Sequence, residues 1–264
     1  MREAQQSLLV CADDFGMNPA IDAAVLELAA AGRLQATSCT ADGPSLAADA
    51  PALLASGLQT GLHLNFTEKL AWDGLYLPLG ALLRASWLRR LDRRALQAQI
   101  ARQLDGFEDA LGRAPHFVDG HQHVHQFPQI RELLLAELGR RYPGRLPWLR
   151  RTTAGKLSGL PWRLRAKARL IGVLGAGALA RQAQREGYAL NRRFLGAYDF
   201  QGGAAAYARW LAAWRANAQP GDLMMCHPAT AATPGDALGA QRVAEFEVLM
   251  AAPPADGAPA RSRA

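Results

Sequence analysis

Val10-Cys11-Ala12-Asp13-Asp14-Phe15-Gly16 is the stretch that decides the fold predicted for this chain. The apolar run that leads into it, residues 7–12, is typical of a fully buried strand, and this strand ends in two adjacent carboxylates. Asn18 is expected to cap a helix that begins at Pro19 and stops at Gly32. The two acids therefore lie in a strand-to-helix turn, at the end of the strand where parallel α/β folds bind ligands.

Asp13 and Asp14 can have different functions, because adjacent residues of a strand point in different directions. One carboxylate can hold a metal ion while the other moves a proton. The alternative is an Asx-type turn, in which one aspartate only caps the helix. The histidines further along the chain bear on this choice.

Strand and helix patterns alternate through the rest of the chain. Further strands are expected over residues 35–41, 58–66, 115–125, 146–152, 191–198 and 222–228, the third of these running into a loop. Further helices are expected over residues 44–55, 93–111, 128–138, 203–218 and 238–250, and a long functional loop over residues 67–91. About seven βα units predict the α/β class and a distorted, TIM-like (β/α) barrel, since the usual barrel has eight.

A single catalytic barrel domain is expected over residues 1–251, and the Ala-, Pro- and Arg-rich tail, residues 252–264, is expected to be disordered. A basic insertion around residues 153–193 interrupts the alternation. Residues 140–193 contain twelve arginines and two lysines but a single acidic residue, Glu186, with apolar side chains interleaved. Two interpretations are open: peripheral contact with an anionic membrane, or a solvated basic helical face over a small core of its own.

The composition of the 264-residue chain fits a protein with a large core, since half of its residues are apolar. The three cysteines are far apart in strand-like runs and are expected to be buried, reduced thiols. The chain opens without a signal-peptide pattern, and no apolar run reaches the roughly 18 residues of a membrane span, so a cytoplasmic protein is expected. The net charge of +7 brings nucleic acid into consideration, but no nucleic-acid motif accompanies it.

Side chains that bind metal ions recur at the predicted strand ends. They are Asp13, Asp14, His63, His121, His123, His125 and His227. A catalytic divalent site needs about three protein ligands and an open position for water. One carboxylate with two imidazoles suits zinc or a similar ion, and Asp14, His63 and His121 supply that set.

Such an ion lowers the pKa of its water and polarises a carbonyl oxygen. Asp13 is then placed to take a proton from the water, and His227 to protonate the leaving group. One alternative is that each histidine is only a satisfied polar residue. Another is that His121, His123 and His125, which share one face of an extended chain, bind metal weakly or support the site from outside. Five of the six histidines lie within or beside three predicted strand ends, which favours the metal site.

Four motifs in a fixed order carry a family resemblance. They are Ala12-Asp13-Asp14-Phe15-Gly16, Gly61-Leu62-His63-Leu64, Asp119-Gly120-His121-Gln122-His123-Val124-His125 and Cys226-His227-Pro228. The chain resembles the YdjC-like carbohydrate deacetylase family, which includes chitooligosaccharide deacetylases and hopanoid-associated deacetylases. The resemblance implies a distorted (β/α) barrel that removes N-acetyl groups from amino sugars with one divalent metal ion, Mg or Zn.

The same resemblance assigns functions to individual residues. It places the metal on Asp14, His63 and His121, and it makes Asp13 the catalytic base and His227 the general acid. Positions that bind substrate are expected at Asn65, His123, His125 and Arg151. The partner implied is an N-acetylated sugar or a glycolipid rather than nucleic acid, and a homodimer is left open. The chain departs from the family at Ala229, where glycine is usual, and in the basic insertion, so the substrate is left open.

Two other classes of protein stay as alternatives. A non-haem metal oxygenase also uses two histidines and one carboxylate, but it leaves Asp13 without a function. A basic protein that binds nucleic acid or an anionic surface is supported by the net charge alone, and it does not explain the histidines at the strand ends.

Overall fold

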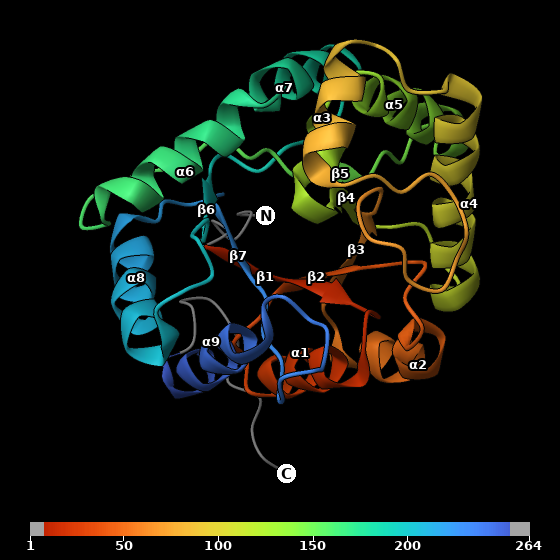
Figure 1. Ribbon diagram of the computed structural model, residues 1–264. Helices are drawn as coiled ribbons and strands as arrows, with labels where there is room; N and C mark the ends of the chain where they lie inside the picture. Colours follow the sequence, from red (N-terminus) through yellow and green to blue (C-terminus); the bar gives the residue numbers. More distant parts are fainter. Residues whose placement is uncertain (1–7, 254–264) are drawn as a thin grey trace, which may run out of the picture.

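Seven parallel strands form one curved sheet at the centre of a computed structural model of the protein (Figure 1). The structure describes residues 8–253, so the predicted disorder of the tail falls, from residue 254 on, outside the described residues. The strands are β1 (Leu9–Phe15), β2 (Ala36–Cys39), β3 (Gln59–Leu64), β4 (Phe117–Gly120), β5 (Trp148–Leu149), β6 (Phe194–Leu195) and β7 (Leu223–Cys226). They lie in the order β5-β4-β3-β2-β1-β7-β6, and neighbours pair in parallel.

The two edges of this sheet are linked by contacts between the edge strands and residues outside the named strands. Leu149 pairs with Leu190 and Ala154 with Phe194, both in parallel. The amide of Leu149 donates to the carbonyl of Ala189 at 2.9 Å. These contacts connect the β5 edge to the β6 edge, and the helices surround the strands in Figure 1. The predicted distorted, TIM-like α/β barrel with seven strands is confirmed.

Helices follow the strands on the outside of the barrel. They are α1 (Pro19–Ala30), α2 (Leu46–Ser56), α3 (Leu79–Trp87), α4 (Arg93–Leu111), α5 (Ile130–Arg141), α6 (Trp162–Val173), α7 (Ala176–Arg185), α8 (Gly203–Asn217) and α9 (Gly239–Ala251). The helix predicted over residues 93–111 has the bounds of α4. The loop predicted over residues 67–91 is interrupted by α3, because Leu82 and Ser86, one turn apart, pack inward.

The basic insertion contains α6, which lies beside β6 in Figure 1, and α7, which lies at the top of that view. Gly175 joins the two helices with a φ of 134°, and a side chain there would collide with the carbonyl of Gln126. α7 buries Leu179 and Ala183 against the barrel, whereas α6 buries little besides Leu164. Within residues 8–253, none of the helices combines the length and the apolar character needed to cross a membrane.

An irregularity in β1 presents the two acids. The pairing of β1 with β2 shifts between Ala12 and Phe15, and Asp14 has a φ of 73°, a value that residues other than glycine rarely adopt. The side chain of Asn18 accepts hydrogen bonds from two amides of the first turn of α1, so the predicted cap is confirmed. The alternative in which an aspartate of the pair only caps the helix is therefore wrong.

Candidate metal centre

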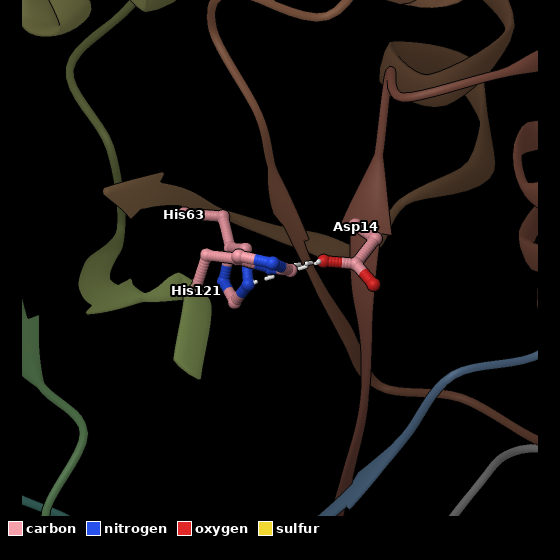
Figure 2. A group of neighbouring side chains, drawn as sticks. All are labelled: Asp14, His63 and His121. Carbon is pink, nitrogen blue, oxygen red and sulfur yellow. Dashed lines mark hydrogen bonds and ion pairs between the residues drawn. The ribbon is translucent and has the colours of Figure 1, made fainter. Parts of the chain in front are cut away.

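Asp14, His63 and His121 come from the ends of β1, β3 and β4 and meet at one point (Figure 2). Nε2 of His63 lies 3.2 Å from Oδ1 of Asp14, and Nδ1 of His121 lies 3.1 Å from the same oxygen. One ligand atom from each of the three residues lies within 4.8 Å of the others. The structure therefore brings together the three side chains predicted to share a metal ion.

His63 is oriented by a buried carboxylate behind it. Its Nδ1 donates to Oδ1 of Asp119 at 2.7 Å, and the hydroxyl of Ser38 lies 2.9 Å from that nitrogen. Nε2 of His63 is buried and makes no hydrogen bond of good geometry within residues 8–253. A carboxylate that fixes one imidazole nitrogen and leaves the other facing a second carboxylate is the usual support of a metal-bound histidine. The residues present therefore fit a divalent ion.

A kink in the backbone turns His121 toward the other two ligands. His121 begins the short 3-10 helix η1 (His121–Gln126), in which Gln122 and His123 have φ values of 51° and 63°. Nε2 of His121 lies 3.3 Å from Oε2 of Glu68, which follows β3. The expectation that His121, His123 and His125 share one face of an extended chain is wrong, because the positive φ values end the extended conformation at β4.

The site attracts positive charge. Burial lowers the pKa of His63, but the charge and hydrogen bond of Asp119 and the nearby aspartates outweigh it and raise this pKa to about 10. Burial likewise lowers the pKa of His121, whereas Asp14 and Glu68 raise it to about 9. At both imidazoles, the carboxylates raise the pKa by more than burial lowers it. The site therefore favours a positive charge, as a site that binds a cation must.

Asp13 lies next to Asp14 in sequence but faces a guanidinium. Arg150 is fully buried and donates to both oxygens of Asp13, at 2.5 and 2.6 Å, and its Nη2 forms an ion pair with Oδ2 of Asp119 at 2.6 Å. Burial raises the pKa of Asp13, but the charge and hydrogen bonds of Arg150 hold it well below its usual range. Asp13 is therefore a carboxylate at neutral pH.

A second group of side chains has the spacing of a cation site. It consists of Cys11, Asp13 and Asp119, all buried. The guanidinium of Arg150 already lies among them, with Nη2 3.2 Å from Sγ of Cys11. This group is therefore neutralised by a side chain of the protein and is not a second metal centre.

The second oxygen of Asp14 is held by a residue of α9. Nη2 of Arg242 donates to Oδ2 of Asp14 at 2.7 Å, and Nε of Arg242 donates to Asp236 at 2.7 Å. Burial raises the pKa of Asp14, but the charge of Arg242 and the bond to His121 hold it well below its usual value. With Oδ2 occupied by Arg242, Asp14 offers one oxygen to a metal ion.

His227 approaches the group from the end of β7. Its Nε2 lies 3.9 Å from Oδ2 of Asp13, and its ring packs edge-on against Phe200 with centroids 5.0 Å apart. The backbone amide of His227 donates to Glu245 at 2.7 Å, which fixes the turn after β7. Burial lowers the pKa of His227 to about 4, so its imidazole is neutral at neutral pH.

Two of the residues expected to bind substrate lie beside the site. The amide of Asn65 is buried and organises the loop after β3, since its nitrogen donates to Asp42 and its oxygen accepts the amide of Glu68. The ring of His123 packs edge-on against Phe194, with centroids 5.3 Å apart. Burial lowers the pKa of His123 well below its ordinary value.

The other two residues expected to bind substrate face away from the ligands. His125 is fully buried, and its Nε2 donates to the carbonyl of Arg150 at 2.8 Å. Nε of Arg151 donates to the hydroxyl of Thr153 at 2.9 Å. Arg151 also lines a cavity of about 740 Å³ between residues 153–158 and the helices of the basic insertion.

Within residues 8–253, four charged residues that contact Asp13 or the predicted metal ligands were not predicted from the sequence. They are Glu68, Asp119, Arg150 and Arg242. A signal was present for Asp119, which stands two residues before His121 in a strand-end motif. No spacing in the sequence indicates that Glu68 or Arg242 approaches the same point.

Fold and site together define an α/β barrel protein with a candidate divalent-metal centre at the carboxyl ends of its strands. Comparison with known proteins identifies its family. The chain belongs to the YdjC-like protein family, whose match covers residues 7–255. The family resemblance inferred from the motifs is confirmed.

Individual relatives match part of the chain. The carbohydrate deacetylase of Homo sapiens is 30% identical over 143 residues, covering 49% of this chain and 44% of that protein. The chitooligosaccharide deacetylase of Serratia marcescens is 32% identical over 141 residues, covering 50% and 55%. The matched region is thus about half the length of these curated relatives. A crystal structure of a proposed cellobiose-phosphate cleavage protein from Enterococcus faecalis V583 has the same fold, with a TM-score of 0.66, 20% identity and coverage of 93% and 90%.

Proposed function

We propose that this protein is a metal-dependent hydrolase that removes the N-acetyl group from an acetylated amino sugar. One observation carries the proposal: Asp14, His63 and His121 converge on one point. Asp13 lies in the same strand as Asp14 and 3.9 Å from His227, and we assign proton transfer to Asp13 and His227. The names of the curated relatives, carbohydrate deacetylase and chitooligosaccharide deacetylase, support this substrate class.

The proposed cofactor is one divalent ion held by Asp14, His63 and His121. Two imidazole nitrogens and one carboxylate oxygen favour zinc over magnesium, which prefers oxygen ligands. When bound, such an ion lowers the pKa of a water molecule and polarises the acetyl carbonyl. Asp119, Glu68 and Arg242 keep the ligand atoms aimed at it.

The reaction is hydrolysis of an amide, in which water adds to the acetyl carbon, the C–N bond breaks, and acetate and a free amine leave. Asp13 is ionised and accepts a proton from the attacking water. His227 is neutral before the reaction, so it has to acquire a proton before it can donate one to the departing amine. We assign the supply of this proton to Asp13, which carries the proton taken from the water and whose Oδ2 lies 3.9 Å from Nε2 of His227.

Paired variants test this assignment. Asp13→Asn is expected to keep the ion and lose turnover, whereas Asp14→Asn is expected to lose both. Mass spectrometry on a panel of N-acetylated sugars and glycolipids, read as loss of one acetyl group, identifies the substrate, and equilibrium dialysis reports the ion. Near wild-type turnover by Asp13→Asn would falsify the assignment of the base.

Oxygen dependence separates this proposal from an oxygenase, which uses the same ligand types. Hydrolysis is expected to proceed equally under nitrogen, and turnover that stops without oxygen would exclude the hydrolase. The cytoplasmic location stays a prediction. Whether the substrate is a free sugar or a glycolipid, and whether the protein forms a homodimer, are left open.

A further inference from the structure

The helix α6 of the basic insertion carries charge of one sign. Its sequence, WRLRAKARLIGV, contains four basic and no acidic residues. Only Leu164 and Ala168 on this helix are buried, so most of its surface faces solvent. A helix that only covers the barrel has apolar residues on its inner side and polar residues outside. α6 departs from that pattern, because its outer side is also partly apolar.

The outer side of α6 carries an apolar stripe. Trp162, Ala166, Leu170 and Val173 are spaced by four, four and three residues, which places them along one face of the helix. The exposed fractions are 70% for Trp162, 58% for Leu170 and 74% for Val173. These are the largest apolar exposures on the helix, and they form a row rather than scattered positions.

Arginines border the stripe on both sides. Arg163 lies on one side, with its guanidinium 5.6 Å from the ring centroid of Trp162, while Arg165 and Arg169 lie on the other by helical spacing. Across residues 8–253, none of these three arginines forms an ion pair. Their charges are therefore available to an external anion.

A basic cavity adjoins the same helix. The cavity of about 740 Å³ is lined by Arg151, Lys156 and Arg169, and Val173 of the stripe also lines it. Within the described chain, no acidic residue lines this cavity. The cavity and the stripe are therefore one continuous surface that combines unpaired positive charge with exposed apolar side chains.

The helix that carries this surface is connected to the segment of the candidate metal centre. The basic insertion begins after β5, so α6 follows the carboxyl end of a strand, as do the three predicted metal ligands. Gln126, in the segment that begins at His121, donates to the carbonyl of Ile171 in α6 at 2.9 Å. α6 is therefore bonded directly to the segment that begins with the predicted metal ligand His121.

We propose that α6 and the adjoining basic cavity bind the surface of an anionic phospholipid membrane. Trp162, Leu170 and Val173 enter the boundary between headgroups and acyl chains, and the bordering arginines contact headgroup phosphates. The inference goes beyond the deacetylase proposal and does not depend on it.

Other occupants fit this surface less well. A second copy of the chain places arginines against arginines, which repel. A nucleic acid accounts for the charge but leaves the central apolar stripe without a partner. An anionic membrane satisfies both features at once.

Flotation with lipid vesicles tests the proposal on the full-length protein. Binding to vesicles of equimolar phosphatidylglycerol and phosphatidylcholine is expected to exceed binding to pure phosphatidylcholine by about tenfold or more, and to weaken with salt. Replacing the stripe (Trp162→Ser, Leu170→Ser and Val173→Ser) is expected to weaken binding by about tenfold or more. Replacing the arginines (Arg163→Gln, Arg165→Gln and Arg169→Gln) is expected to weaken binding to anionic vesicles by about fivefold per charge.

Controls separate this surface from general stickiness. Leu54→Ser removes a partly exposed leucine of α2, 38% exposed, and is expected to bind vesicles like the wild type. Circular dichroism and hydrolysis of a soluble substrate are expected to be unchanged in the stripe and arginine variants, because none of these residues contacts the candidate metal centre. The arginine variant changes only solvent-exposed side chains and provides a second test if the stripe variant does not fold.

Several results would overturn the proposal. Equal binding to neutral and anionic vesicles, or wild-type binding by the stripe variant, excludes it. Complete displacement from vesicles by glycerol 3-phosphate shows a site for a small anion instead. A wild-type dimer that the stripe variant converts to a monomer shows that a second copy covers this face.

Discussion

Arg150 and Arg151 are chemically identical neighbours in opposite surroundings. Arg150 is fully buried between Asp13 and Asp119, whereas Arg151 is partly exposed and has a hydroxyl as its side-chain partner. A buried guanidinium with two carboxylates is costly to disrupt, because removing it leaves uncompensated charge in the interior. The two positions therefore form a matched pair for mutation.

Arg150→Met is expected to lower the free energy of unfolding by about 3–5 kcal/mol, since Asp13 and Asp119 lose their cation. Arg151→Met, the matched control, is expected to cost about 1 kcal/mol or less. Urea denaturation followed by circular dichroism measures both. Equal stability of the two variants would mean that the buried contacts of Arg150 add little to the free energy of unfolding.

At this scale, direct sequence reasoning predicts that Asp14, His63 and His121 converge, as they do in the structure, because each lies at the end of an apolar strand. It fails for Arg150, because β5 has only two residues and gives no alternation from which to tell which arginine faces the barrel. The partners of Arg150 also lie far away, with Asp13 137 residues distant in sequence. Only the fold brings them together.

At the scale of the element, the loop after β3 supplies a carboxylate to the candidate metal centre that its sequence does not predict. Asn65 holds the loop so that Glu68 reaches Nε2 of His121 at 3.3 Å. A carboxylate behind a metal-bound histidine fixes the orientation of its ring and raises its basicity. The side chain of Glu68 is 50% exposed, so its removal has little effect on folding.

Glu68→Ala is therefore expected to weaken metal binding by about tenfold or more without lowering thermal stability in the presence of chelator. Asp73→Ala, in the same loop with a side chain 93% exposed, is the matched control and is expected to bind like the wild type. Competition with a fluorescent zinc chelator measures the affinities. If Glu68→Ala binds zinc as tightly as Asp73→Ala, Glu68 does not support the site.

The sequence predicts some helices and turns of the structure accurately and others not at all, and the reasons are physical. The periodic apolar pattern of α4 gives its bounds from sequence, and the Asn18 cap gives the start of α1. The sequence does not predict the 3-10 turn at His121. Positive φ values are usually indicated by glycine, and here they occur at Gln122 and His123. A strand pattern continued into that turn therefore placed three histidines on one face incorrectly.

At the scale of the whole molecule, the barrel arises from contacts that no single segment specifies. The alternation of strands and helices predicts the class and the number of strands, as the structure confirms. The link between its edges depends on the isolated pairings Leu149–Leu190 and Ala154–Phe194, each of which joins a residue of an edge strand to a residue outside the strands. The site depends on this closure, because His123 packs against Phe194 across it.

Protonation of the two imidazoles couples folding to the proposed binding of a metal ion. The pKa values of His63 and His121 are raised to about 10 and about 9, above the ordinary value of 6.5. For a histidine whose pKa is raised by folding, the stabilisation is full below the unfolded value and is lost as the pH rises through the folded value. The chelator-stripped protein is therefore expected to lose stability between about pH 7 and pH 10.

A metal ion needs unprotonated nitrogens, so at neutral pH its binding to the stripped protein is expected to release roughly two protons and to tighten as the pH rises. Calorimetric titration with zinc in buffers of different ionisation enthalpy counts these protons. His116→Gln is a suitable control, because His116 lies just before β4, at the end of the strand away from the candidate metal centre. Its pKa is lowered mainly by burial, so its loss is expected to leave the proton count unchanged. Since zinc relieves the loss of stability at high pH, the rise in melting temperature on adding zinc should grow with pH. Zinc binding that releases no protons at neutral pH would show that both imidazoles are already neutral. In that case the neighbouring carboxylates do not raise the pKa values of His63 and His121 above neutral pH.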